Sequence, residues 1–331
     1  MSVTRHDVLA AREIIAGRVH RTPVFPSTTL GDRIGGRAFL KAELFQKTGS
    51  FKPRGVLNKL ASLTPEEKAR GVVTWSAGNH AQAVGWAATS QGIDCLVVMS
   101  AGANPRKVAA TRGYGATVDL EAPDHAAAHE RLLRLIEETG RTYVPPYDDP
   151  HVIAGQGTVG LEIAQDVPNV AAVFVPIGGG GLASGVAAAV KALVPTARLI
   201  GVEPELAADA RDSLAAGEIV RWAAEDVSRT IADGTRTQAL GKRTFAHIRT
   251  HLERIVTVSE EEIAAAVRLA AERSRLVVEP SGALGIAALT FHAGELGLEP
   301  TAGPTVAVVS GGNVDPDRYR ELLAAHILPE R

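Results

Sequence analysis

Short apolar runs alternate with longer alanine- and leucine-rich stretches through most of this 331-residue chain. The short runs are rich in valine and isoleucine and predict buried strands, whereas the longer stretches predict helices. The expected strands are 72–75, 95–99, 170–177, 198–202 and 305–309, and the expected helices are 80–90, 104–112, 125–138, 182–193 and 260–274. This alternation predicts an α/β fold with parallel sheets that helices cover on both faces.

The composition limits what the chain binds and where it works. Hydrophobic residues make up 45% of the chain, and the formal net charge is −2. Lysine and arginine are spread along the chain, so we expect neither nucleic-acid nor membrane binding. The single cysteine, Cys95, excludes an intrachain disulfide, which is typical of a reducing cytoplasm. Residues 1–7 carry no apolar signal and no stretch could span a bilayer, so we expect a cytoplasmic protein.

One lysine stands in an unusual local sequence. Lys52 lies in Gly49-Ser-Phe-Lys-Pro-Arg-Gly55, where the glycines permit bends and the close approach of a ligand. Pro53 suits the first turn of a helix, which we expect to continue over 56–63. A rigid loop-to-helix junction would aim the Lys52 amine at an electrophile such as a carbonyl group. An ordinary surface lysine at a helix start fits this segment equally well when it is taken alone.

Four consecutive glycines follow a predicted strand and precede a predicted helix: Gly178, Gly179, Gly180 and Gly181. Unpaired amides at a helix N-terminus bind anions, because they point at the ligand along the helix dipole. A tight strand-to-helix turn is the simpler explanation, but it needs fewer glycines. The run therefore predicts a phosphate-binding loop.

The same glycines allow an alternative of a different class. Gly178, Gly180 and Ala183 satisfy a G-x-G-x-x-A pattern, and Glu203 ends the next predicted strand, where an acid could bind a ribose. This pattern indicates an NAD-dependent oxidoreductase. It leaves the Lys52 segment unexplained.

Further motifs stand at characteristic intervals: Ser76-Ala-Gly-Asn-His80, Glu279-Pro-Ser-Gly-Ala283 and Ser310-Gly-Gly-Asn313. With Lys52 and the glycine run, they make residues 22–313 resemble the fold-type II pyridoxal-phosphate (PLP) enzymes. Within these, the chain is most similar to the serine/threonine dehydratases (threonine ammonia-lyases) and serine racemases. The resemblance implies a tryptophan-synthase-β-like fold of two parallel-sheet domains with the cofactor in the interdomain cleft, and commonly a homodimer.

The resemblance also implies the domain boundaries. The small domain would cover residues 65–148 and would be inserted into a discontinuous large domain of residues 1–64 and 149–331. Only residues 314–331 follow the last motif, so we expect no C-terminal regulatory domain and a catabolic form of the enzyme.

Site roles follow from the resemblance, position by position. Lys52 would hold pyridoxal 5'-phosphate covalently and act as the base, Phe51 would pack on its ring, and Asn79 would bind its ring hydroxyl. Ser310 would face the pyridine nitrogen, and the glycine run would bind the phosphate. The substrate carboxylate would lie against the loop formed by Ser76, Ala77, Gly78, Asn79 and His80. Glu279 and Gly234 would lie near the cofactor without an assigned role.

A divalent cation is a further expectation. In several family members a Glu, a backbone carbonyl and an Asp bind the ion, and the matching positions here are Glu203, Ala207 and Asp209. Oxygen ligands suit Mg²⁺, Ca²⁺ or Mn²⁺. Two carboxylates near a helix start are also common in the absence of a metal.

The resemblance implies β-elimination of L-threonine or L-serine, a small hydroxyamino acid, to 2-oxobutyrate or pyruvate and ammonia. Family racemases carry a serine where this chain has Ala77, and alanine cannot transfer a proton, so elimination is favoured over racemisation. A dehydratase of 3-hydroxyaspartate or phenylserine would share the cofactor motifs. The former needs a cation near the β-substituent, for which Arg54, Arg236 and Arg243 are candidates.

Overall fold

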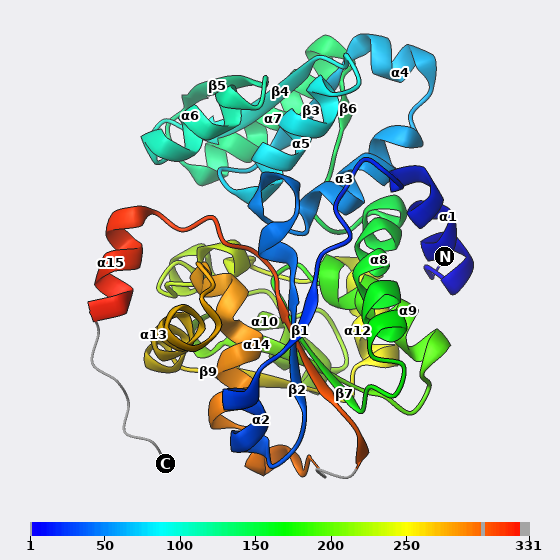
Figure 1. The fold of residues 1–331 in the computed structure, drawn as a ribbon. Coiled ribbons are helices and arrows are strands. Elements are labelled where there is room, and N and C mark those ends of the chain that lie inside the picture. The colour runs from blue at the N-terminus through cyan, green and yellow to red at the C-terminus, as the bar shows by residue number, and fades with distance from the viewer. Residues whose placement is uncertain (1, 299–301, 325–331) are drawn as a thin grey trace.

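The computed structural model describes residues 2–298 and 302–324. The smaller of its two sheets has four parallel strands in the order β5-β4-β3-β6 (Figure 1). These strands are β3 (Val72–Trp75), β4 (Cys95–Ser100), β5 (Thr117–Ala122) and β6 (Thr142–Tyr143). The helices around them are α4 (Pro65–Arg70), α5 (Asn79–Thr89), α6 (Pro105–Gly113) and α7 (His125–Thr139).

Alternation along the strands decides which helix each face meets. Cys95 and Val97 of β4 pack in one cluster with the apolar side chains of α5, whereas Val98 and its neighbour Val73 on β3 pack against α7. Successive residues of a strand point to opposite faces, so a continuous apolar run serves two helix layers at once.

The larger sheet has six strands in the order β1-β2-β10-β7-β8-β9. They are β1 (Val24–Pro26), β2 (Ala38–Ala42), β7 (Ala172–Pro176), β8 (Arg198–Pro204), β9 (Arg254–Val258) and β10 (Thr305–Val309). All neighbours are parallel except the edge strand β1, which pairs with β2 in the antiparallel direction. The two parallel-sheet regions confirm the predicted fold class, with β1 as an unforeseen antiparallel edge.

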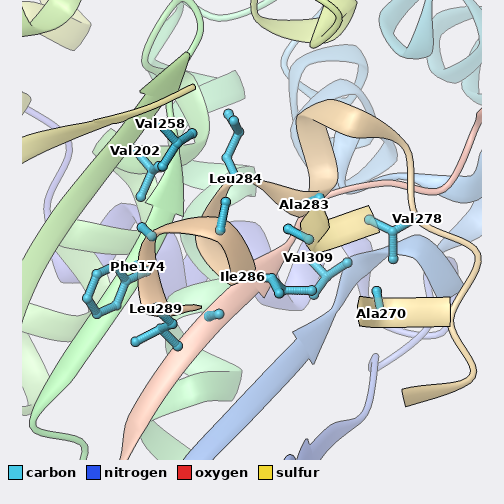
Figure 2. Packing of buried hydrophobic residues seen from close by; sticks show 14 of the residues in the cluster. Phe174, Val202, Val258, Ala270, Val278, Ala283, Leu284, Ile286, Leu289 and Val309 are labelled. Atoms are coloured by element: carbon cyan, nitrogen blue, oxygen red, sulfur yellow. The ribbon is translucent and has the colours of Figure 1, made fainter. Parts of the chain in front are cut away.

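Helices cover both faces of the larger sheet (Figure 1). One face meets α8 (Pro150–Asp166), α9 (Gly181–Leu193) and α12 (Lys242–His251), and the other meets α2 (Thr28–Ile34), α13 (Glu260–Leu269) and α14 (Pro280–Phe291). Figure 2 shows the second core, where Leu284 and Leu289 of α14 lie among Phe174, Val202 and Val258 of the strands. The remaining helices are α1 (Arg5–Ile15), α3 (Lys52–Ala61), α10 (Asp209–Ala216), α11 (Ala224–Val227) and α15 (Pro316–Ala324).

The expected elements agree closely with the observed ones, with one clear difference. Strands 72–75 and 305–309 are found with the predicted bounds. The helix expected over 260–274 ends as an α-helix at Leu269 and continues as a π-helical segment, Ala270–Ser274. No helix within the described ranges has the length and apolar character needed to cross a membrane. The domain boundaries stay a prediction.

Candidate active site

Lys52 is the first residue of α3, with Pro53 in the first helical turn. Its Nζ donates a hydrogen bond to the Pro146 carbonyl at 2.9 Å and lies 5.1 Å from the centroid of the Phe51 ring. Burial lowers the pKa of Lys52 to about 8, although the nearby Glu279 carboxylate acts in the opposite direction. About a tenth of this amine is therefore uncharged at pH 7, far more than at the ordinary lysine pKa, and the uncharged form is what a nucleophile or base requires.

Ser310 lies next to the Lys52 segment at the carboxyl end of β10. The Phe51 amide donates to the Ser310 carbonyl at 3.1 Å, and Ser50 and Gly311 form an isolated antiparallel bridge. The buried Ser310 hydroxyl has only a long hydrogen bond, 3.5 Å, to the Ser281 carbonyl. It is therefore weakly held by the protein and available to another acceptor.

The four glycines connect β7 to α9 at the same edge of the sheet. Gly180 has a left-handed backbone with φ of 86° and is the N-cap of α9, and it has no side chain to bond the first amides of that helix. A Cβ on Gly179 would enter the Tyr147 ring, and one on Gly181 would lie 3.0 Å from the Tyr147 Cβ. The glycines therefore permit close packing on Tyr147 and leave the first amides of α9 without a side-chain cap, as an anion site requires.

Tyr147 brings the glycine loop and Lys52 together. It directly follows Pro146, whose carbonyl accepts the Lys52 hydrogen bond. On the other side of the loop, a Cβ on Gly178 would lie 3.1 Å from the Cα of Thr235, and the Gly234 amide donates to the Ser281 hydroxyl at 2.8 Å. The expected cofactor-lining position of Gly234 is therefore adjacent to the loop.

The 76–80 loop connects β3 to α5. Gly78 is the N-cap of α5 and makes no side-chain cap, and Ala77 is exposed. His80 is buried, its Nε2 lies 2.9 Å from the Val144 carbonyl, and burial together with the Lys52 charge lowers the pKa of His80 to about 3. This histidine is consequently neutral and packed in the protein.

Asn79 is fixed by two distant segments. Its Nδ2 donates to Glu279 Oε1 at 2.7 Å, and its Oδ1 accepts from Asn313 Nδ2 at 2.8 Å. The sequence motifs contained all three residues but assigned a role only to Asn79. No local signal could pair side chains that are 200 and 234 residues apart.

Glu203 and Asp209 form a buried acidic pair beyond the end of β8. Glu203 accepts hydrogen bonds from the Ala210 and Arg211 amides at 3.1 and 2.8 Å. Both oxygens of Asp209 are buried without a hydrogen-bond partner. Burial raises the pKa of Glu203 well above its usual range and that of Asp209 to about 7, and Asp209 also contributes to the shift in Glu203. Because Glu203 is wholly buried, it is not available to a ribose hydroxyl.

Arg54 is not a substrate ligand, contrary to one sequence expectation. Its guanidinium is buried and donates to Glu43 Oε2 at 2.8 Å and to Glu162 Oε1 at 2.7 Å. Residues two apart on a helix point in nearly opposite directions, so Arg54 faces away from Lys52. Arg236 and Arg243 are exposed, and Arg236 Nε donates to the Thr230 carbonyl at 3.0 Å.

The converging groups suit a phosphorylated aldehyde with an aromatic ring. They supply an amine of lowered pKa, a helix start without a side-chain cap, a weakly bonded hydroxyl and an oriented carboxamide. An amine can react with an aldehyde and uncapped helix amides can bind a phosphate, so this set of groups is compatible with pyridoxal phosphate. A separate cavity of about 300 Å³ lies at the amino-terminal ends of β7, β8 and β10, beside Ala172, Arg198 and Thr305.

Comparisons with known proteins agree with this arrangement. A family model described as "Pyridoxal-phosphate dependent enzyme" matches residues 15–311. The chain is 42% identical over 322 residues to the catabolic L-threonine dehydratase of Escherichia coli, covering 97% of this chain and 96% of that protein. It is 42% identical over 323 residues to the L-threo-3-hydroxyaspartate ammonia-lyase of Saccharomyces cerevisiae, covering 97% and 96%. The structure of maize serine racemase superimposes with a TM-score of 0.91 at 36% identity, covering 98% of both chains.

Proposed function

Because the chain belongs to the family of pyridoxal-phosphate dependent enzymes, we propose that it is an ammonia-lyase that acts on L-threonine, L-serine or both. The observation that carries the proposal is the Lys52 amine, which has a pKa lowered to about 8 and is aimed by its hydrogen bond to Pro146. The product is 2-oxobutyrate from threonine or pyruvate from serine, with ammonia in both cases.

The chemistry needs one base near the substrate Cα. When bound, pyridoxal phosphate withdraws electrons from that carbon and so weakens its C–H bond. Lys52, once free of the cofactor, would remove the Cα proton, and the β-hydroxyl would take up one proton and leave as water, so that the elimination removes one water in all. The unsaturated amine that is released then hydrolyses to the keto acid and ammonia. His80 takes no proton because its pKa of about 3 keeps it neutral.

The other site residues hold and orient. The first amides of α9 and the four glycines would bind the phosphate, and the Ser310 hydroxyl would face the pyridine nitrogen. Phe51 packs against the ring, and Asn79 binds the ring hydroxyl. The amides of the loop from Ser76 to His80 bind the substrate carboxylate, because the start of α5 has no side-chain cap.

Ala77 separates elimination from racemisation. A racemase needs a second proton-transferring group on the face opposite Lys52, and the exposed Ala77 methyl group cannot supply it. The 3-hydroxyaspartate alternative draws support from the yeast relative's name. This alternative needs a cation near the β-substituent, and Arg54 cannot be that cation because it is paired with Glu43 and Glu162.

We also propose a divalent cation, Mg²⁺, Ca²⁺ or Mn²⁺, at Glu203, the Ala207 carbonyl and Asp209. The two buried Asp209 oxygens, which have no hydrogen-bond partner, suit a cation ligand, because an unpaired buried carboxylate is costly. In the described part of the chain, no group of three or more His, Cys, Asp or Glu side chains is placed to hold a metal ion, so carbonyls and water would have to complete the coordination. A cytoplasmic location and a homodimer remain further proposals, the latter testable by light scattering.

A substrate panel tests the proposed reaction. Purified protein loaded with pyridoxal phosphate would be given L-threonine, L-serine, threo-3-hydroxyaspartate and phenylserine, with keto acid and ammonia measured together. We expect equimolar keto acid and ammonia from threonine or serine. Keto acid from threo-3-hydroxyaspartate or phenylserine alone would make that compound the substrate in place of threonine and serine. Formation of a D-amino acid without keto acid would contradict the elimination.

A further inference from the structure

Glu279 is part of a hydrogen-bond relay whose direction the protein fixes. The Thr48 carbonyl can only accept, so Asn313 must turn its Nδ2 toward it, at 2.7 Å. The same Nδ2 donates to Asn79 Oδ1 at 2.8 Å, which leaves the Asn79 Nδ2 to face Glu279 Oε1 at 2.7 Å. One end of the relay thus determines the orientation of the Asn79 carboxamide, and Glu279 closes the other end.

The backbone around the relay leaves room for these side chains. A Cβ on Gly49 would collide with Asn313 Oδ1, and a Cβ on Gly311 would collide with Glu279 Oε1. Gly49 has φ of 75°. The preceding residue, Thr48, has φ of 60°, which is unfavourable for a β-branched residue. The backbone here therefore accepts strain at Thr48 and has glycine at both contact positions. Both features are expected if the position of the Asn313 and Glu279 side chains matters to the protein.

Glu279 does not serve the helix on which it lies. It is the N-cap of α14, yet its side chain makes no capping hydrogen bond. Its carboxylate is buried, with 5% of the residue exposed, and it turns to Asn79 from the other sheet region. A buried carboxylate that forgoes helix capping and instead holds a carboxamide of the site indicates a role at the site.

We propose that Glu279 is a positioning residue, which holds Asn79 so that its second Nδ2 hydrogen is presented to the ring hydroxyl oxygen of pyridoxal phosphate. This inference rests on the proposed function of Asn79. Asn79 has two Nδ2 hydrogens, and one of them is used by Glu279. The remaining hydrogen lies in the same plane and is fixed in direction once the first is bonded.

The charge of Glu279 adds a pH-dependent element. Burial and Asp233 raise the pKa of Glu279 to about 7, whereas the Asn79 hydrogen bond and Lys107 lower it. The Glu279 charge also acts on Lys52, whose pKa it raises. An ionised carboxylate accepts a hydrogen bond about twice as strongly as a neutral carbonyl, so the relay is firmest above pH 7.

Retention of pyridoxal phosphate by the full-length protein tests the proposal, with equilibrium dialysis as a readout independent of turnover. Glu279→Ala should weaken retention about tenfold to hundredfold, because the carboxamide loses a charged acceptor. Glu279→Gln keeps a carbonyl acceptor, so it should be about threefold to tenfold weaker than wild type at pH 8.5 and equal to it at pH 5.5. Glu262→Gln is the matched control. It changes a carboxylate that accepts from the Ser259 amide at the start of α13, and it should leave cofactor retention unchanged.

Asn79→Ala and the double variant separate the two proposals. Effects of Asn79→Ala and Glu279→Ala should be strongly non-additive, because both act through one hydrogen bond. Weak retention in Asn79→Ala with wild-type retention in Glu279→Ala would overturn the role of Glu279 alone. Wild-type retention in Asn79→Ala would overturn the proposed role of Asn79. If Glu279→Ala does not fold, the pH-dependent ratio of wild type to Glu279→Gln decides, and a ratio that is constant with pH contradicts the proposal.

Discussion

Arg54, two residues after the candidate lysine, donates to Glu43 Oε2 at 2.8 Å in the interior of the protein. The same guanidinium donates to Glu162, which also accepts from Lys41 Nζ at 2.5 Å. The charges of two cations, Lys41 and Arg54, therefore balance those of two carboxylates, Glu43 and Glu162. Each carboxylate oxygen of Glu43 and Glu162 accepts at least one hydrogen bond. This network fixes the helix whose first residue is Lys52.

Removing one partner of the network should be costly. Arg54→Met fills most of the volume but leaves Glu43 and Glu162 short of a partner, so we expect a loss of about 3–5 kcal/mol in the free energy of unfolding. Urea-induced unfolding measures it. Arg12→Met, which removes an exposed pair with Glu13, should change the free energy by less than about 0.5 kcal/mol. Equal stability of the two variants would contradict the buried network.

Gly180 is held by conformation and by contacts together. Gly180→Ala would force an L-residue to φ of 86° and bring its Cβ to 2.9 Å from side-chain atoms of Ile248, Leu240 and Thr244. Gly217 has φ of 75° but open space around it, so Gly217→Ala measures backbone strain alone. We expect about 1–2 kcal/mol for Gly217→Ala and distinctly more for Gly180→Ala in thermal unfolding. Equal losses of stability in the two variants would show that the side chains around Gly180 move aside without cost, and would contradict the role of these contacts.

The lowered pKa of Lys52 sets a pH dependence for covalent loading. The neutral amine is the reactive form, and its fraction rises through a pKa of about 8. The rate at which apoprotein gains the cofactor absorbance should therefore increase about tenfold per pH unit below pH 7 and level off above pH 9. Stopped-flow absorbance measures the profile. An inflection at the ordinary lysine value of 10.5 would contradict the buried environment.

Asp209 should make cation binding depend on pH. Its pKa is raised from 3.8 to about 7, so its contribution to stability is present below pH 3.8 and is lost as pH rises to 7. A cation requires the ionised form. Mg²⁺, Ca²⁺ or Mn²⁺ should therefore raise the unfolding temperature at pH 8 but not at pH 5.5.

Asp209→Asn provides the matching variant. It should abolish the response to the cation and, without added metal, stabilise the protein at pH 8 by about 1 kcal/mol, because it removes an unpaired buried charge. A cation response that survives in Asp209→Asn would place the metal elsewhere.

Local patterns were enough to predict five of the ten strands in the described part of the chain, and several of its helices. Pro53 and the apolar residues after it predicted α3, and the valine-rich runs predicted β3 and β10 with correct bounds. α8 was not predicted, and its interior glycines lower the local helix propensity. In the structure, a Cβ on Gly160 would lie 2.6 Å from the Val186 carbonyl, so these glycines allow α8 to pack closely on α9.

A candidate site residue could be found from the sequence where its own segment carries a signal. Lys52, the glycine run and the 76–80 loop each carry a local signal in glycine, proline or a strand-to-helix change. The partners of Asn79 do not, because Glu279 and Asn313 reach it through the fold. Arg54 was misjudged for the same reason: nearness in sequence does not give the direction in which a helical side chain points.

The attachment point of the cofactor is the most direct test of the account. Protein loaded with pyridoxal phosphate would be reduced with borohydride, digested and analysed by mass spectrometry to find the modified lysine. We predict that the reduced cofactor is on Lys52 and that Lys52→Ala takes up no covalent label while keeping its fold. Label on another lysine such as Lys41 or Lys59, or none in the wild type, would contradict it.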